Sequence, residues 1–380
     1  MKLTHRIFTI IFMMILFLPL AFVNPYGDIV SEQENRMLAK RPATSGLFLQ
    51  PADFTRQFDR WFADNVGFRE QLIGLYKKLD SLETQGQYSD GSNIMLIGEQ
   101  GHHYFADIGG WLIGKFQGKA LLTDEQLVKL SDGLNAIQAY LNKKDIPFIL
   151  MFCADKETIY PEYYPKSIIK GPDPDQLDTV SEYIMNHTNI DFFSVKACLL
   201  EAKKHYPVFD KVGDARMILS HHSEIGAFFT YQELMKHITT YMPQIKALTA
   251  EDVSFTYHDV GDYQNISDVI LLQDQRYRSL DSDFFTNIPL QHPSQGSAFE
   301  NDDASLPTIL IMRDSYTGNG NYISRYIPQH FGKTILIHWN NTRSLTEYID
   351  ILNPDIVVFE VAERMLIDFP NAVADFHAAK

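Results

Sequence analysis

The stretch from Thr308 to Tyr316 constrains the fold more than any other part of the chain. It begins as a short apolar run and ends abruptly in Arg-Asp-Ser-Tyr, and a more helical stretch follows from Tyr322 to Phe331. This pattern predicts a buried strand, a sharp turn and a helix. Sites in open α/β sheets are built where strands end at such turns. Ser315 is therefore the first candidate for a functional residue.

Two interpretations of Ser315 are open at this point. A serine at this turn has an exposed hydroxyl, and its N–H lies near a helix N-terminus, where negative charge is stabilised. Acyl transfer uses such a serine to attack a carbonyl. The other interpretation is that Asp314 and Ser315 only cap the following helix. The Asp-Ser-Tyr turn by itself favours the cap, so the choice depends on the rest of the chain.

The remaining periodicity predicts an α/β fold, a three-layer sandwich around a mostly parallel sheet. An amphipathic helix from Thr123 to Lys144 precedes a near-continuous apolar strand, 146–152, and helix followed by apolar strand is typical of parallel sheets. The predicted helices are 54–82, with an interruption at 67–68, 195–205, 223–242 and 345–352, and the predicted strands include 208–209, 334–337 and 356–359.

Four segments are expected. Residues 1–25 form a signal anchor or signal peptide, 26–90 a helical and extended region, and 91–380 the α/β domain with an insertion at 251–305. The first segment carries positive charge at 2–6 and an apolar run at 7–23 without a small-residue cleavage site. This favours an uncleaved membrane anchor and a domain outside the cytoplasm, periplasmic or extracellular.

Composition excludes several classes of protein. The formal net charge of −15 argues against a nucleic-acid partner. The two cysteines, Cys153 and Cys198, lie in apolar or helical surroundings, which predicts buried, unreactive thiols. No Cys/His spacing suggests zinc, and we expect neither a metal nor a cofactor.

A nucleophilic serine needs a base, which is usually a histidine oriented by a carboxylate. The candidate is His221, at the start of the predicted helix 223–242, with His222 as the alternative. For a histidine at a helix start, a core or capping role is the other interpretation.

Four pieces of the chain carry a resemblance to a known family. They are Ser31 to Arg36, Pro147 to Pro161, His221 to Gly226, and Asp314 to Tyr316 followed by 353–364. In this order and spacing they resemble the SGNH-hydrolase-like domain of the alginate O-acetyltransferase proteins of the AlgX/AlgJ type.

The resemblance implies Ser315 as nucleophile and His221 as base. The family's third piece reads Asp-Thr-His-Trp-Asn with a glycine five residues after the histidine, and counting back from Gly226 gives His221. Leu219 then stands where the family has aspartate, and a register slip to His222 supplies no carboxylate either. Substitute acids near in sequence are Asp214, which we favour, Asp210 and Glu224.

Smaller expectations concern the transition state and the substrate. We expect the Ser315 N–H to donate to the oxyanion. Asn319, Asn340 and Asn341 are candidates for the second donor, and each is otherwise a turn residue. Arg313 is a candidate for binding a substrate carboxylate, or forms a surface ion pair. Trp339 is a candidate for stacking on a sugar, or belongs to the core.

The resemblance implies an O-acetyltransferase or acetyl esterase acting on a cell-surface polysaccharide, supplied by a multi-span membrane acyltransferase partner. Because Leu219 replaces the aspartate, enzymatic activity is an open question. The alternative is a catalytically silent relative that binds glycan or scaffolds a polysaccharide assembly or export complex.

Overall fold

The computed structural model describes residues 8–9, 12–13, 17–19, 21–24, 30–31, 36–45, 51–69, 87–89, 94–106, 111–119, 121–212, 221–260, 263–290, 296–318 and 323–376. The chain divides into two compact units, Met1–Ile94 and Met95–Lys380. The predicted boundary between 90 and 91 and the predicted insertion 251–305 are not tested by this division.

The first unit contains a short antiparallel pair, β1 (Val30–Ser31) and β2 (Arg36–Met37), then helix α3 (Pro51–Asn65) and strand β3 (Gln87–Ser89). The predicted interruption at 67–68 is confirmed, because α3 ends at Asn65 and Phe68 has a left-handed backbone, φ 60°. Within the described ranges, no helix has both the length and the apolar composition needed to cross a membrane. Most of the predicted membrane segment lies outside those ranges.

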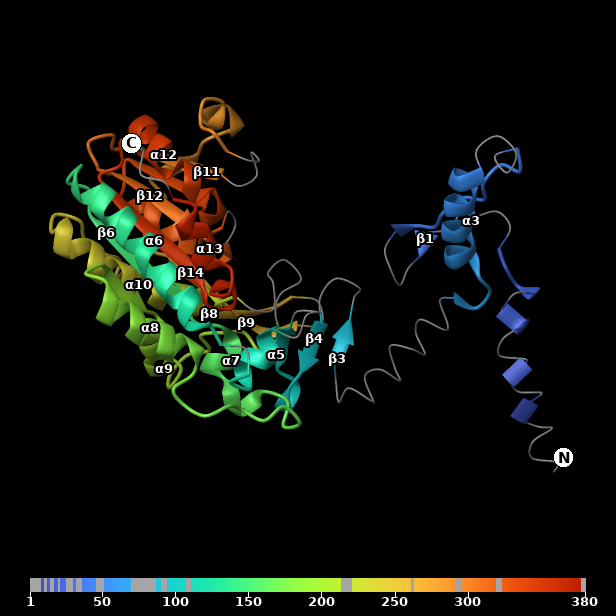
Figure 1. The fold of residues 1–380 in the computed structure, drawn as a ribbon. Coiled ribbons are helices and arrows are strands. Elements are labelled where there is room, and N and C mark those ends of the chain that lie inside the picture. Colours follow the sequence, from blue (N-terminus) through green and yellow to red (C-terminus); the bar gives the residue numbers. More distant parts are fainter. Residues whose placement is uncertain are drawn as a thin grey trace. The chain divides into compact units, whose positions relative to one another are not determined.

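The second unit is built on a seven-stranded sheet in the order β10-β11-β13-β12-β14-β6-β7 (Figure 1). The five strands from β13 to β7 are parallel, and β11 and β10 extend the β13 edge in antiparallel pairing. The prediction of a mostly parallel sheet is confirmed. The strands are β6 (Phe148–Cys153), β7 (Asp191–Ser194), β10 (Tyr277–Ser279), β11 (Gly296–Asn301), β12 (Thr308–Arg313), β13 (Lys333–His338) and β14 (Ile356–Ala362).

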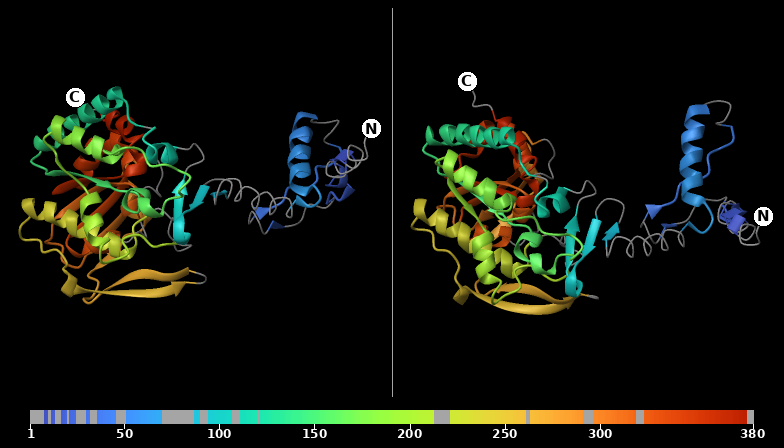
Figure 2. Two further views of the ribbon diagram at one scale, coloured as in Figure 1. Left: turned by 90° about the horizontal axis from the view of Figure 1, so that it is seen from below. Right: turned by 60° about the horizontal axis from the view of Figure 1, so that its bottom comes forward.

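Helices cover both faces of this sheet, which makes three layers (Figures 1 and 2). Helices α6, α8 and α13 contact one another on one face, and α9, α10 and α11 do so on the other. The helices of this unit are α5 (Trp111–Phe116), α6 (Asp124–Asn142), α7 (Lys156–Ile159), α8 (Gln176–His187), α9 (Lys196–Ala202), α10 (Glu224–Tyr241), α11 (Ile323–Tyr326), α12 (Leu345–Leu352) and α13 (Phe369–Ala374).

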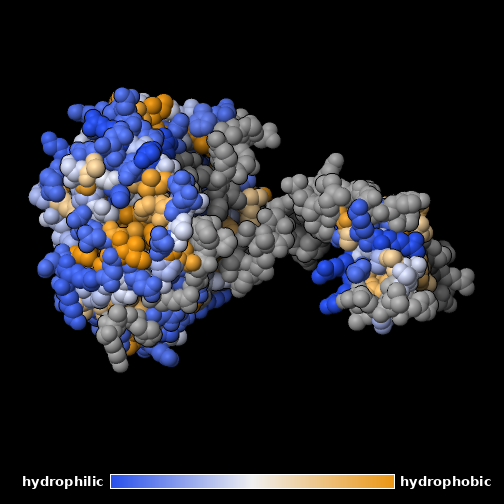
Figure 3. All heavy atoms as spheres, turned by 90° about the horizontal axis from the view of Figure 1, so that it is seen from above, coloured by the Kyte–Doolittle hydropathy of each residue, from blue (hydrophilic) through white to orange (hydrophobic). Residues whose placement is uncertain are grey.

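The central strands are apolar because both of their faces are covered. Every residue of β6 and β14 is buried, as expected for parallel strands between two helix layers. At the surface, the face of this unit seen in Figure 3 is mostly hydrophilic, with hydrophobic residues gathered near its middle.

One sequence-based prediction near the site is wrong. Val208 and Phe209 form no strand: their loop crosses the first turn of α10, where the Val208 carbonyl accepts from the Ser223 N–H at 3.0 Å. A Cβ on Gly226 would lie 2.1 Å from that same oxygen, so only glycine allows this approach. The helical stretch predicted over 322–331 is present as α11 followed by a 3₁₀ turn, Ile327–Gln329.

The region 251–305 is divided between two sheets. Strands β8 (Val253–Val260) and β9 (Tyr263–Leu271) form a separate antiparallel ribbon, whereas β10 and β11 belong to the central sheet. A further small sheet includes the neighbouring strands β4 (Ile94–Ile97) and β5 (His103–Ala106). The sequence pattern did not predict that β10 and β11 extend the central sheet, because strands at a sheet edge carry fewer apolar residues than buried central strands.

Candidate active site

Three adjacent parallel strands deliver side chains to one edge of the sheet. Ser315 follows β12, Asp155 follows β6, and Arg364 follows β14 within a 3₁₀ turn, Glu363–Met365. His221 joins them from just before α10. Carboxyl ends of neighbouring parallel strands meet at one edge, which is the usual location of sites in such sheets.

Ser315 and His221 meet at one guanidinium nitrogen. Nη2 of Arg364 lies 3.2 Å from the Ser315 Oγ and 3.3 Å from the His221 Nε2. The hydroxyl and the ring nitrogen therefore lie within two hydrogen-bond lengths of each other. Arginine has only donors, so His221 Nε2 accepts from Arg364 and carries its lone pair on the side that faces the site.

Arg364 is held from behind by a buried acid. Its Nη1 donates to Asp155 Oδ1, and its guanidinium lies over the Tyr316 ring, 5.0 Å from the centroid. The Tyr316 hydroxyl donates to the Ala154 carbonyl at 3.1 Å, which fixes the ring. A buried arginine with an ionised partner and an aromatic neighbour keeps one orientation.

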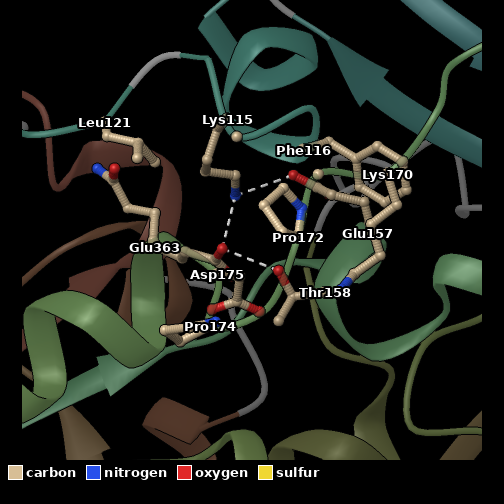
Figure 4. Close-up of a pocket in the computed structure, with 13 residues that line it drawn as sticks. Lys115, Phe116, Leu121, Glu157, Thr158, Lys170, Pro172, Pro174, Asp175 and Glu363 are labelled. Atoms are coloured by element: carbon tan, nitrogen blue, oxygen red, sulfur yellow. Dashed lines mark hydrogen bonds and ion pairs between the residues drawn. The ribbon is translucent and has the colours of Figure 1, made fainter.

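A second cation balances the acids around Asp155. Lys115 Nζ contacts Asp155 at 2.9 Å, Glu157 at 3.0 Å and Glu363 at 2.9 Å, and Thr158 donates to Glu363 at 2.8 Å. Figure 4 shows Lys115, Glu157, Thr158 and Glu363 beside a small cavity of about 70 Å³. Burial by itself would lower the Lys115 pKa, but the three carboxylates raise it well above its ordinary value.

The same balance keeps Asp155 ionised. Burial alone would raise the pKa of Asp155, yet Lys115 and then Arg364 lower it below its ordinary value. The carboxylate that orients Arg364 is thus charged at neutral pH.

The turn that carries Ser315 is braced by two further acids. Asp314 accepts from the Ser315 N–H at 2.6 Å through Oδ1, and from Trp339 Nε1 at 3.0 Å and the Ala362 N–H at 3.2 Å through Oδ2. Glu360 Oε2 accepts from the Asp314 N–H at 2.9 Å, and from the Thr317 N–H at 3.1 Å and Oγ1 at 2.8 Å. The Asp314 cap that the sequence predicts is present, while the Ser315 hydroxyl is left for Arg364.

Comparison with protein families gives a match over most of the second unit. Residues 110–352 match the family described as SGNH hydrolase-like domain, acetyltransferase AlgX. The chain belongs to this family. No curated protein sequence matches the chain.

PatB1 of Bacillus cereus and a DHHW family protein have a similar fold at low identity. PatB1 of Bacillus cereus with a sulfonyl adduct has a TM-score of 0.54 and 13% identity, covering 77% of this chain and 99% of PatB1. A DHHW family protein from Eubacterium siraeum has a TM-score of 0.51 and 12% identity, covering 77% of this chain and 98% of that protein. The O-acetyltransferase domain of Pseudomonas putida AlgJ has a TM-score of 0.43 and 15% identity, over 72% of this chain and 91% of the domain.

Three groups predicted to act on the substrate, Trp339, the Ser315 N–H and Arg313, make contacts within the protein. Trp339 is only 4% exposed and packs edge-on against Phe369, so it belongs to the core and offers no face to a sugar. The Ser315 N–H, predicted as an oxyanion donor, is engaged by Asp314. Arg313 is partly buried, and its Nη1 donates to the Asp314 carbonyl at 3.4 Å. Asn319 lies outside the described residues.

Two of the predicted substitute acids, Asp210 and Glu224, bond to other parts of the protein, and the favoured one, Asp214, is not tested. Asp214 and Leu219 lie outside the described residues. Glu224 pairs with Arg325 and accepts from the Val269 N–H at 2.6 Å, and Asp210 accepts from the Ser267 N–H at 3.1 Å, so both acids face the β8–β9 ribbon or α11.

His222, the alternative base, is directed into the core. Its Nδ1 lies 3.1 Å from Thr230 Oγ1, and burial, with the neighbouring His221 adding to it, lowers its pKa to about 3. It is thus a neutral packing residue, whereas His221 is the histidine that meets Arg364.

Sequence reasoning missed Asp155, Arg364, Lys115 and the bracing acid Glu360. Asp155 follows the predicted strand 146–152, and Glu360 and Arg364 follow the predicted strand 356–359. Their position after a strand is the same feature that identified Ser315 as a candidate. Lys115 carried no such signal, because its short helix α5 lies outside the βα pattern.

Proposed function

We propose that this chain is an O-acetyltransferase of the AlgX type, with Ser315 as the nucleophile that carries the acetyl group to a cell-surface polysaccharide. Membership of a family described as acetyltransferase supports the reaction class. The observation that carries the proposal is the meeting of Ser315 Oγ and His221 Nε2 at Arg364.

The geometry suits an acetyl-enzyme mechanism. Loose geometry between nucleophile and base is common in unliganded sites and tightens when substrate binds. His221 Nε2 can take the Ser315 proton once its hydrogen bond with Arg364 is released, and the ionised Asp155 balances the charge of Arg364. These residues supply a nucleophile, a base and a fixed positive charge in one place.

By analogy with the family, the enzyme works outside the cytoplasm. An anchor within residues 1–25 would hold it at the membrane, where a multi-span acyltransferase partner would deliver the acetyl group. Polysaccharide as acceptor is also taken from the family, since the AlgX-type proteins modify alginate.

A catalytically silent glycan-binding or scaffolding protein is the second candidate. The observation that favours it is Leu219, at the position where the family pattern has the orienting aspartate. Loss of that aspartate in a serine triad costs about 10⁴-fold in rate.

Kinetics on a small acetyl ester such as 4-nitrophenyl acetate separate the two candidates. We expect Ser315→Ala and His221→Ala each to lower kcat by at least about 10³-fold, while His222→Gln retains most of the activity if it folds. Wild-type activity no higher than that of Ser315→Ala would support the silent protein.

A further inference from the structure

We propose that Arg364 is the oxyanion donor of this site, replacing the backbone N–H of the serine. This inference rests on the proposed function and adds one catalytic residue to it. Acyl transfer needs hydrogen-bond donors aimed at the developing oxyanion. The Ser315 N–H instead donates a 2.6 Å hydrogen bond to Asp314 Oδ1.

Asp314 is fixed in the position that engages this N–H. Its other oxygen accepts from Trp339 and from the Ala362 backbone, and its own N–H donates to the buried Glu360. Turning the Asp314 carboxylate away from Ser315 would break both Oδ2 bonds in a buried environment, where unmade hydrogen bonds are costly. The backbone donor is therefore committed to the turn.

Arg364 stands at the alternative donor position. Its Nη2 is 3.2 Å from the Ser315 Oγ, which is the atom that bonds to the carbonyl carbon. The oxyanion forms one bond beyond that carbon, within the reach of a fork of N–H groups centred on Nη2. The guanidinium is permanently charged, and burial among Asp155, Tyr316 and Trp111, whose Nε1 donates to the Arg364 carbonyl at 3.0 Å, holds it still.

The proposed step forms acetyl-Ser315 through a tetrahedral intermediate. Ser315 Oγ forms a bond to the acetyl carbonyl carbon, the carbonyl π pair moves to its oxygen, and the Oγ proton moves to His221 Nε2. Arg364 Nη2 turns its hydrogen bonds from Oγ and Nε2 to the new oxyanion. Collapse of the intermediate breaks the bond to the donor's leaving group, which takes the proton from His221 and leaves acetyl-Ser315.

Charge pairing explains why Arg364 can stabilise the oxyanion beside His221, which becomes protonated in the same step. An imidazolium next to an unbalanced guanidinium would be repelled, but the ionised Asp155 neutralises Arg364, and the oxyanion appears in the same step. The negative charge that develops is thus placed between two cations.

The test is chemical rescue of Arg364→Ala. We expect kcat on 4-nitrophenyl acetate to fall by about 10²- to 10³-fold with little change in KM, and added guanidinium chloride at low, non-denaturing concentration to restore at least a tenth of wild-type kcat. Sodium chloride at equal ionic strength should restore nothing. A merely structural role would not be rescued by a free guanidinium ion.

The matched control is Arg325→Ala, which removes a different guanidinium paired with a partly buried acid, Glu224. It should keep kcat within about threefold of wild type and show no guanidinium effect. If Arg364→Ala does not fold, Arg364→Lys takes its place: it keeps the charge but loses the fork, and kcat should still fall at least tenfold with KM unchanged.

The outcomes separate this inference from the proposed function. Inactive Ser315→Ala together with near-wild-type kcat in Arg364→Ala or Arg364→Lys would overturn the oxyanion role alone, and so would an Arg364→Ala loss without rescue. Activity in Ser315→Ala equal to wild type would overturn the proposed function itself.

Discussion

The indole Nε1 of Trp339 donates a 3.0 Å hydrogen bond to the carboxylate of Asp314, the residue directly before the candidate nucleophile. Trp339 begins the 3₁₀ turn after β13, and Asp314 follows β12, so this bond ties together the ends of two neighbouring strands. The candidate nucleophile thus depends on a side chain that the substrate does not reach.

Replacing Trp339 with phenylalanine should loosen this turn. The substitution keeps an aromatic ring against Phe369 but removes the donor to Asp314, and we expect the free energy of unfolding to fall by about 1–2 kcal/mol. Activity on the acetyl ester should fall through kcat. Thermal melting and steady-state kinetics measure both, with Trp61→Phe in the first unit as the control that keeps wild-type kcat. Wild-type stability and kcat in Trp339→Phe would contradict this role.

Lys156 should be a structural residue of the second unit, not part of the chemistry. Its buried Nζ donates to three carbonyl oxygens, those of His103 at 2.8 Å, Asp210 at 2.6 Å and Lys211 at 3.0 Å. Lys156→Met leaves all three acceptors without this donor, and we expect a loss of about 3 kcal/mol or more.

Lys129→Met is the matched control, because the hydrogen bond from Lys129 to Asn371 is exposed. Its thermal midpoint should stay close to that of wild type. Equal midpoints for Lys156→Met and Lys129→Met would refute the structural role.

Glu360 predicts a pH dependence of stability. Burial, and then the neighbouring Asp314, raise the Glu360 pKa to about 7, above the ordinary 4.5 of the unfolded chain. At a pH between these two pKa values, Glu360 is protonated in the folded protein and ionised in the unfolded chain. The free energy of unfolding therefore falls as pH rises through this window: the contribution is fully present below 4.5 and lost above about 7.

Glu360→Gln tests that window. Its amide oxygen can accept the same bonds from Asp314 and Thr317, and the side chain no longer titrates. Relative to wild type, the variant should gain stability between about pH 5 and about pH 8, by at most on the order of 3 kcal/mol. Groups such as Glu363 titrate in both proteins and cancel in the difference. A constant difference across this range would exclude the raised pKa.

A substitution at Leu219 tests which groups orient His221. If Asp155 and Arg364 substitute for the family's aspartate, introducing Leu219→Asp should change kcat by less than about tenfold. A gain approaching the 10⁴-fold that a triad carboxylate supplies would show a handicapped wild-type site. The acetyl ester assay with Ser315→Ala as the blank measures either outcome.

The N-terminal residues predict membrane association. Because the run 7–23 is apolar and lacks a small-residue cleavage site, we expect the full chain to sediment with membranes and to resist extraction by carbonate. Fractionation with N-terminal sequencing decides the point. A soluble mature form that begins between Asn24 and Ser31 would identify a cleaved signal instead.

The sheet was predictable because buried parallel strands are read directly as apolar runs. The runs ending at Phe152, Arg313 and Phe359 are all strands in the fold, and they carry Asp155, Ser315 and the 363–364 turn at their ends. Val208 was misassigned because two apolar residues beside a helix look alike in a strand and in a buried loop.

The interactions within the site could not be predicted, because they join distant parts of the chain. Ser315 and Arg364 are 49 positions apart, and His221 and Arg364 are 143 apart. Strand order brings Ser315 and Arg364 together, the packing of α10 brings His221 to them, and sequence periodicity gives neither. For Trp339, the sequence suggests a role that the fold does not give it. An aromatic residue at a strand end is a candidate for sugar stacking, but the Trp339 N–H has a buried partner in the Asp314 carboxylate.

The acetylation state of Ser315 tests the central claim most directly. The protein is incubated briefly with 4-nitrophenyl acetate, quenched in acid, digested and analysed by peptide mass spectrometry, with Ser315→Ala treated in parallel. The account predicts one acetyl group on Ser315, accumulating before steady state and removed by an acceptor sugar. Acetylation confined to lysines, equal in wild type and Ser315→Ala, would contradict it.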